Sequence, residues 1–244
     1  GVDIDWEFPV QGGLKGNVER PVDRQNFTLL LAELRRELDA QGSKDKRHYE
    51  LSIAASARPS EIANIELDRI VPLLDFVNVM TYDYHTGGSI AHFNAPLFAA
   101  ANDPTPELTA DASIHAFRAG GVPADKLLVG IPFFARVYGQ VPNVNAGLFQ
   151  KSGGAPKGWE DADGNWRRLA RKQLRDPRYT RHWESSAQVP WIYDSRSGTW
   201  ITYDDPEAVR AKVNYVRQNG LGGVVIWELA ADDGRLMRAI AGSH

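Results

Sequence analysis

Strand-like and helix-like segments alternate along most of the chain, and this alternation constrains the fold more than any other feature. Strands are predicted at residues 1–7, 49–55, 75–82, 126–134 and 222–229. Helices are predicted at residues 23–40, 109–119 and 206–218, and helical turns at 60–74, all between these strands. A short helix is predicted after the last strand, at residues 232–241. Strands that alternate with helices of this length indicate a parallel sheet with helices outside. Periodicity alone leaves two folds open, a doubly wound sheet and part of a (β/α)8 barrel.

Residues 137–203 interrupt this rhythm. The segment is rich in Gly, Pro, Trp and Tyr and contains short alternating pieces such as Thr199 to Tyr203. So many large aromatic residues are not typical of a disordered linker. We therefore expect a small α+β insertion here.

Three carboxylates at a spacing of two stand at the start of the chain, at Asp3, Asp5 and Glu7. Successive side chains of a strand point to opposite faces, so these acids are predicted to share one face. The other face would carry apolar residues: Val2, Ile4, Trp6 and Phe8. Like charges this close repel one another, so a strand that served only the fold would gain little from them. A solvated edge strand and a divalent-cation site remain the alternatives.

This strand resembles the end of the D-G-x-D-x-D-x-E signature on the fourth strand of family 18 chitinases, with the leading Asp cut off by the start of the chain. The resemblance implies that Glu7 is the general acid. It also implies that Asp5 turns between Asp3 and the acetamido group of the substrate. The third-strand S-x-G-G motif of the family is absent from the sequence.

Further motifs of the same family follow along the chain. Residues 80–83 (MTYD) resemble the sixth-strand M-x-Y-D motif, residues 131–136 resemble the seventh-strand pattern, and residues 222–229 (GGVVIWEL) resemble the eighth strand. The resemblance implies that Tyr82 donates to the acetamido carbonyl oxygen. It assigns substrate binding to the following residues: Met80, Asp83, Arg136, Trp159, Glu160 and Trp227. Of these, Trp227 would form the floor beneath the −1 sugar, and Trp159 and Glu160 would wall the cleft.

The fold class that the resemblance implies is α/β, namely the C-terminal five strands of a (β/α)8 TIM barrel with a small α+β insertion domain. The expected parts are 1–136 for barrel strands 4–7, 137–203 for the insertion, and 204–244 for helix 7 to helix 8. The first three strands are then expected to be missing. Five strands of eight leave two raw edges, so we expect this chain alone to be poorly stable.

Composition excludes several other classes of function. A net charge of −3 and a pI near 6.1 give no electrostatic footprint for nucleic acid or anionic membrane. The chain has no cysteine, so disulfides, zinc–thiolate sites and a cysteine nucleophile are excluded. His85 and His92 lack a matched set of further ligands, which favours loop histidines over a metal site. We expect no cofactor and no metal.

The resemblance implies chitinase activity with retention and substrate assistance, in which the substrate's N-acetyl oxygen replaces a second protein carboxylate. Two positions depart from the family pattern. Phe134 stands where many relatives have Tyr, and residues 84–89 lack the Trp that often follows M-x-Y-D. Two other functions remain open, an endo-β-N-acetylglucosaminidase acting on glycoprotein glycans or peptidoglycan, and a chitinase-like lectin.

The expected partner is chitin or a chito-oligosaccharide, with neither nucleic acid nor membrane as a partner. The full-length protein is expected to be a monomer. Secretion is inferred from the polymeric substrate and not from any residue.

Overall fold

The computed structural model describes residues 1–156, 159 and 164–242, which form two compact units. Unit 1 comprises Gly1–Met80, Ala112–Val129 and Val216–Val225. Unit 2 comprises the described residues of Thr81–Asp111, Gly130–Tyr215 and Ile226–His244.

Parallel strands form the sheet of unit 1, in the order β1-β2-β3-β4-β10. Register pairs join Asp3 to Ser52, Ala54 to Asn78, and Val77 to Leu127. The strands span Val2–Asp5 (β1), Leu51–Ser56 (β2), Phe76–Met80 (β3), Leu127–Pro132 (β4) and Gly223–Trp227 (β10). The last residues of β4 and β10, 130–132 and 226–227, belong to the ranges of unit 2. Strands β1 and β10 are the two edges of this order, so the sheet is open. The predicted parallel sheet is confirmed.

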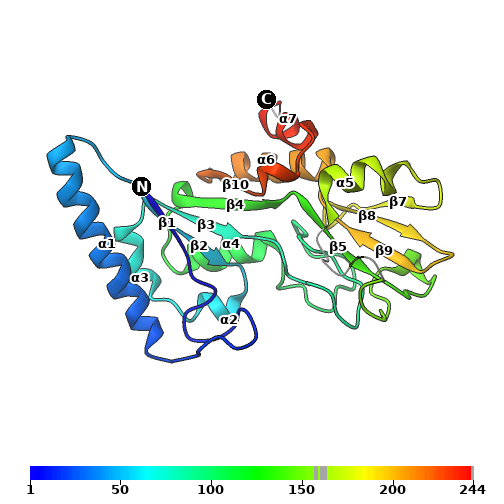
Figure 1. Ribbon diagram of the computed structural model, residues 1–244, viewed down its shortest axis with the longest axis horizontal. Helices are drawn as coiled ribbons and strands as arrows, with labels where there is room; N and C mark the ends of the chain where they lie inside the picture. The colour runs from blue at the N-terminus through cyan, green and yellow to red at the C-terminus, as the bar shows by residue number, and fades with distance from the viewer. Residues whose placement is uncertain (157–158, 160–163, 243–244) are drawn as a thin grey trace. The chain divides into compact units, whose positions relative to one another are not determined.

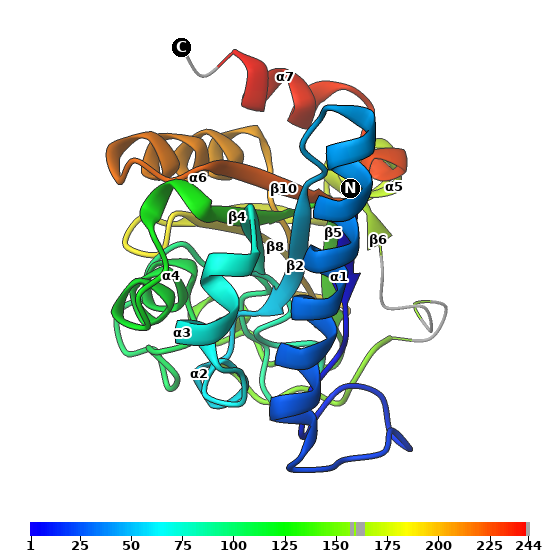
Figure 2. The same cartoon turned by 90° about the vertical axis from the view of Figure 1, so that its left-hand side faces the viewer.

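Helix α1 (Asp23–Asp45) packs against β2 and against helix α3 (Leu67–Ile70), as Figure 2 shows. Its buried face includes Phe27 and Leu31, whereas Leu30 is 41% exposed because it is turned about 100° away from Leu31. Short turns α2 (Pro59–Ile62) and Val71–Leu73 flank α3. Helix α4 (Ala110–Ala119) precedes a 3₁₀ turn at Ala124–Lys126.

Unit 2 contains an antiparallel sheet with strand order β6-β5-β9-β8-β7. Figure 1 labels β5, β7, β8 and β9, and Figure 2 labels β6. The strands span Phe134–Tyr138 (β5), Gly164–Asn165 (β6), Thr180–Glu184 (β7), Val189–Asp194 (β8) and Thr199–Thr202 (β9). Helix α5 (Trp166–Arg171) packs against β5 and β6. Helices α6 (Pro206–Gln218) and α7 (Arg235–Ala241) follow along the chain.

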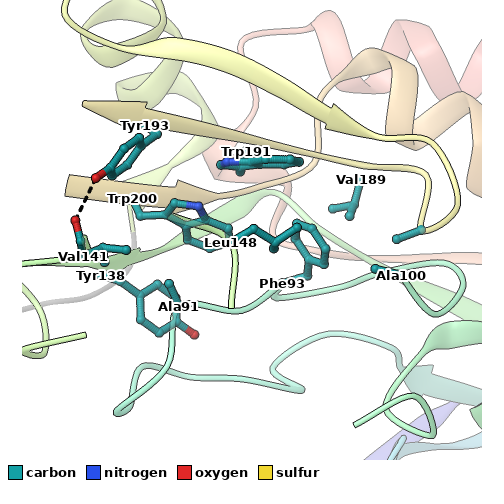
Figure 3. Packing of buried hydrophobic residues seen from close by; sticks show 11 residues of the cluster. Ala91, Phe93, Ala100, Tyr138, Val141, Leu148, Val189, Trp191, Tyr193 and Trp200 are labelled. Carbon is teal, nitrogen blue, oxygen red and sulfur yellow. Dashed lines mark hydrogen bonds between the residues drawn. The ribbon is translucent and has the colours of Figure 1, made fainter. Parts of the chain in front are cut away.

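An aromatic core fills unit 2 against one face of β8 and β9 (Figure 3). Trp200 is fully buried and lies 5.6 Å from the ring of Tyr138 and 5.9 Å from that of Phe93. Tyr193 donates its hydroxyl to the carbonyl of Val141 at 2.7 Å. These tryptophans and tyrosines therefore pack the α+β segment, as its aromatic content predicts.

One predicted strand, residues 126–134, is two strands in the structure. Strand β4 ends at Pro132, which has no N–H to donate to a ladder, and β5 begins at Phe134 with antiparallel pairing. In the part of the chain that the structure describes, no helix has both the length and the apolar character needed to cross a bilayer.

Candidate active site

The three acids at the start of the chain are all exposed and alternate with partly buried apolar residues from Val2 to Phe8. On the apolar side the ring of Trp6 lies 5.7 Å from that of Phe27, edge to face, which anchors β1 to α1. The acids thus lie on the face that points away from α1. The predicted two-faced strand is confirmed, although β1 itself ends at Asp5.

Asp3 is fixed by two neutral donors, one from β2 and one from β3. The hydroxyl of Ser52 donates to Asp3 Oδ1 at 2.6 Å, and the side-chain amide of Asn78 donates to the same oxygen at 3.0 Å. Ser52 and Asn78 are buried. Parallel register makes this possible because it brings Ser52 directly beside Asp3. The inner carboxylate is therefore held in one orientation.

Met80 ends β3, and Glu7 follows β1, at the same carboxyl edge of the parallel sheet. Active sites of parallel barrels are found at this edge. The peptide bonds Glu7–Phe8 and Trp227–Glu228 are both cis.

Unit 2 brings Asp83 and Arg136 together. Arg136 Nη2 lies 2.6 Å from Asp83 Oδ1, and its Nε donates to the same oxygen at 2.8 Å. The guanidinium carbon lies 4.8 Å from the ring centre of Phe134, which in turn lies 5.6 Å from the ring of Tyr82. Tyr82, Asp83, Phe134 and Arg136 therefore form one cluster, and Phe134 is its apolar centre.

The backbone at Asp83 is left-handed, with a φ of 58°. Its N–H donates to Asn94 Oδ1 at 3.0 Å. The carbonyl of His85, two residues after Asp83, accepts a hydrogen bond from the hydroxyl of Tyr138 at 3.1 Å. Burial raises the pKa of Tyr138 to about 12, so the hydroxyl keeps its proton and this hydrogen bond. Asn94 and Tyr138 together hold the segment that presents Asp83.

Trp227 is 56% exposed at the end of β10. Its backbone carbonyl accepts a hydrogen bond from the N–H of Phe133 at 2.7 Å. The indole is thus presented by a fixed backbone and is not a core side chain.

Trp159 lies against Arg168, whose guanidinium carbon is 4.9 Å from the indole ring centre. The Cα of Gly164 packs so close to this ring that a Cβ there would lie 2.9 Å from it. Glu160, the other residue predicted to wall the cleft, lies outside the described residues.

The predicted site residues fall in both units. Asp3, Asp5, Glu7 and Met80 belong to unit 1. Five others belong to unit 2: Tyr82, Asp83, Arg136, Trp159 and Trp227. Within unit 2, the structure brings Tyr82, Asp83 and Arg136 together.

Sequence reasoning missed Ser52, Asn78 and Asn94 as supports of the site. A signal existed for Asn78, which is a polar residue within an apolar strand. A buried amide needs a hydrogen-bond partner, and here the partner is Asp3. Ser52 and Asn94 gave no comparable local signal.

A buried network surrounds the two histidines noted in the sequence. His92 Nε2 lies 2.9 Å from Asp103 Oδ1, and the ring of His85 stacks on that of His92 with a centroid separation of 3.6 Å. Among the residues that the structure describes, no group of three or more His, Cys, Asp or Glu side chains could hold a metal ion.

Comparison with known proteins identifies the class. The family model "Glycosyl hydrolases family 18" matches residues 1–232, so the chain belongs to this family of glycoside hydrolases. Chitinase A1 of Niallia circulans is 39% identical over 249 residues, which cover 98% of this chain and 35% of that protein. The chain therefore spans about a third of the length of this curated relative.

Two solved structures are also similar over the whole chain. Chitinase ChiW from Paenibacillus sp. is 40% identical with a TM-score of 0.93, and the match covers 100% of this chain and 28% of that chain. A family 18 N-acetylglucosaminidase from Paenibacillus barengoltzii is 36% identical with a TM-score of 0.92, covering 100% of this chain and 70% of that one. These matches confirm the predicted α/β fold class of the TIM-barrel type, and the resemblance to family 18.

Proposed function

We propose that the protein is a chitinase that hydrolyses β-1,4 bonds between N-acetylglucosamine units with retention of configuration. The observation that carries this proposal is the set of exposed carboxylates at Asp3, Asp5 and Glu7 in a chain that belongs to family 18. The names of the relatives, which include chitinases of bacteria, support the same substrate class.

In the proposed first step, Glu7 protonates the glycosidic oxygen as the bond to C1 breaks. The carbonyl oxygen of the substrate's N-acetyl group attacks C1 and forms an oxazolinium ion. Asp5 accepts the acetamido N–H and offsets the developing positive charge. Tyr82 donates its hydroxyl to the acetamido oxygen and so holds it in the attacking position.

In the second step, water attacks C1 while Glu7 takes its proton, so that Glu7 returns to its acid form. The bond between C1 and the acetamido oxygen breaks at the same time, which opens the oxazolinium ring and restores the N-acetyl group. Asp3 does not touch the substrate in this scheme. Its role is to receive the Asp5 side chain before substrate arrives, and the hydrogen bonds from Ser52 and Asn78 support it by fixing Asp3 in one orientation.

The remaining predicted residues are proposed to bind the sugar chain. Trp227 offers an exposed ring on which a pyranose can stack, and the Asp83–Arg136 pair offers both an acceptor and donors to hydroxyl groups. Met80, Trp159 and Glu160 are proposed as further contacts, the last two within an insertion spanning residues 137–203. Secretion and a monomeric full-length protein are proposed as well, from the substrate class.

A second candidate is an exo-acting N-acetylglucosaminidase. The similarity to the Paenibacillus barengoltzii enzyme favours it, because the match covers 70% of that chain. The two activities share the same chemistry at C1 and differ in the products released.

Hydrolysis of chitotetraose and cellotetraose by the full-length protein tests the proposal. Mass spectrometry identifies the products, and NMR identifies the anomer that forms first. Chitotetraose alone should be cleaved, with the β-anomer formed first. Disaccharide product supports the chitinase, and monosaccharide product supports the N-acetylglucosaminidase. The Glu7→Gln variant should bind chitotetraose without cleaving it, whereas Glu50→Gln, an exposed acid elsewhere in unit 1, should leave turnover unchanged. Hydrolysis of cellotetraose would contradict the N-acetyl-assisted mechanism.

A further inference from the structure

The backbone of Glu7 is contacted by a loop and lies beyond the strand ladder. The register pairs of β1 with β2 end at Asp5 and Ala54, two residues before Glu7. The side-chain amide of Asn17 donates to the carbonyl oxygen of Glu7 at 2.9 Å. The loop from Pro9 to Arg20 therefore returns to the residue that the proposed mechanism uses as its acid and base.

Gly13, in the same loop, packs directly on this carbonyl. A Cβ at Gly13 would lie 2.1 Å from the Glu7 oxygen and 2.7 Å from Asn17 Nδ2, and its φ of 78° is in the left-handed region. No side chain fits there without moving the Glu7 peptide group. Gly16 differs, because its φ is 102° but nothing lies within 4 Å of a Cβ built on it.

The base of the loop is tied to the start of α1. The N–H of Gly12 donates to Glu19 Oε1 at 3.2 Å. Arg20 makes two hydrogen bonds to the buried carboxylate of Asp23, at 3.0 and 2.6 Å, and Asn26 donates to the same group at 2.9 Å. These contacts fix where the loop returns, and so where Asn17 and Gly13 meet Glu7.

We propose that Asn17 and Gly13 are positioning residues for Glu7. The amide of Asn17 holds the Glu7 carbonyl, and the bare Cα of Gly13 leaves the space in which that peptide group lies. Together they set the direction of the Glu7 Cα–Cβ bond and hence the place of its carboxyl group above the scissile bond. The inference rests on the proposed function, since it concerns the group that transfers the proton.

Substitution of Asn17 tests the hydrogen bond. Asn17→Ala removes the donor, and Asn17→Asp keeps the shape but places a carboxylate against a carbonyl oxygen. A displacement of the acid by a fraction of an ångström to 1 Å lowers the rate by about tenfold to about 100-fold. We expect kcat on chitotetraose to fall in that range in both variants, more in Asn17→Asp, with KM unchanged. Leu14→Ala is the matched control, because Leu14 is 83% exposed in the same loop.

Substitution of the glycines tests the packing. Gly13→Ala and Gly16→Ala place the same methyl group on the same loop at a positive φ, so both variants carry backbone strain. Only Gly13→Ala pushes against Glu7, and only this variant should lose kcat with KM retained. Thermal melts followed by circular dichroism check that each variant folds. If Gly13→Ala does not fold, the two Asn17 variants alone test the positioning role.

The outcomes separate the two proposals. Wild-type protein that fails to cleave chitotetraose, or a Glu7→Gln variant as active as wild type, overturns the proposed function. Active wild-type protein whose Asn17 variants match Leu14→Ala in kcat overturns the positioning role alone. A fall in kcat confined to the Asn17 and Gly13 variants supports it.

Discussion

Arg136 binds Asp83 through two nitrogen atoms that converge on one carboxylate oxygen, at 2.6 and 2.8 Å. Both side chains are partly buried, so the pair is screened less than a surface ion pair. These two contacts fix the orientation of the guanidinium group over the ring of Phe134, which packs against Tyr82. It joins two segments, residues 80–83 and strand β5, that are about fifty residues apart in the sequence.

Removal of either partner of this pair should weaken substrate binding and turnover together. Arg136→Ala leaves a partly buried carboxylate without its cation, and Asp83→Asn removes the charge that orients the guanidinium. We expect each to lower kcat/KM on chitotetraose by about tenfold to about 100-fold, which corresponds to about 1.4–2.7 kcal/mol. In a double-mutant cycle, the double variant should lose much less transition-state stabilisation than the sum of the two single losses. Full additivity in kcat/KM would show that the pair does not act as a unit.

Substitution of Trp227 should affect substrate affinity much more than the stability of the fold. Because its side chain is 56% exposed, Trp227→Ala should change the free energy of unfolding by less than about 1 kcal/mol. Chitotetraose affinity should nevertheless fall by about tenfold, since ring stacking on the sugar is lost. Leu229→Ala is the control, because Leu229 is 63% exposed two residues further on. Calorimetric titration measures the affinity, and a large loss of melting temperature with affinity retained would assign Trp227 a structural role.

The supports of Asp3 give a prediction for β1, the strand that leads to the proposed acid Glu7. Ser52→Ala and Asn78→Ala each remove one buried donor to Asp3 Oδ1 and should each lower kcat, because Asp3 is then free to turn. Each loss should also destabilise the fold by about 1 kcal/mol. Ser113→Ala is matched for stability, since Ser113 is equally buried and donates to the carbonyl of Ala57. Equal kcat in the Ser52 and Ser113 variants would contradict the support role.

The order of strands and helices could be predicted because it depends on local periodicity. The alternation along Val2 to Phe8 appears in the structure as alternating exposure. The division of residues 126–134 into β4 and β5 could not be read from the apolar run, because it depends on a distant partner. The N–H of Phe133 leaves the ladder for the carbonyl of Trp227, nearly a hundred residues later.

The supports of the site were harder to predict than its motifs for the same reason. Asp3, Asp83 and Trp227 stand in short patterns that one sequence displays. Ser52 reaches Asp3 only through strand register, which no local pattern fixes. Asn94 lies eleven positions after Asp83 in the sequence and accepts a hydrogen bond from its N–H.

A buried ion pair gives a prediction for the stability of unit 2. Lys212 on α6 and Asp204 bind each other with both side chains almost fully buried. Burial lowers the pKa of Lys212 and raises that of Asp204, while their mutual attraction opposes both changes. Lys212→Met or Asp204→Leu alone leaves an uncompensated charge and should cost about 3–5 kcal/mol. The double variant should be more stable than either single one, as urea unfolding would measure. A double variant as unstable as the sum of both would contradict this account.

The His92–Asp103 pair predicts how stability depends on pH. The N–H of Phe93 donates to His92 Nδ1 at 2.8 Å, so Nε2 carries the proton and donates to Asp103. Burial by itself would raise the pKa of Asp103, but hydrogen bonds from His92 and from the N–H of Thr105 hold it below its ordinary value. A carboxyl group with a lowered pKa in the folded state stabilises the protein above the unfolded value of about 3.9, and this contribution is lost as the pH falls through the folded value.

Asp103→Asn should therefore lower the melting temperature at pH 6–7, and the difference from wild type should shrink as the pH falls below about 4. Thermal melts between about pH 2.5 and pH 7 measure this difference. Asp68→Asn removes the same charge from an exposed side chain on α3, and it corrects for the change in net charge. A difference between wild type and Asp103→Asn that stays constant, or grows, as the pH falls would mean that the Asp103 charge does not stabilise the folded state.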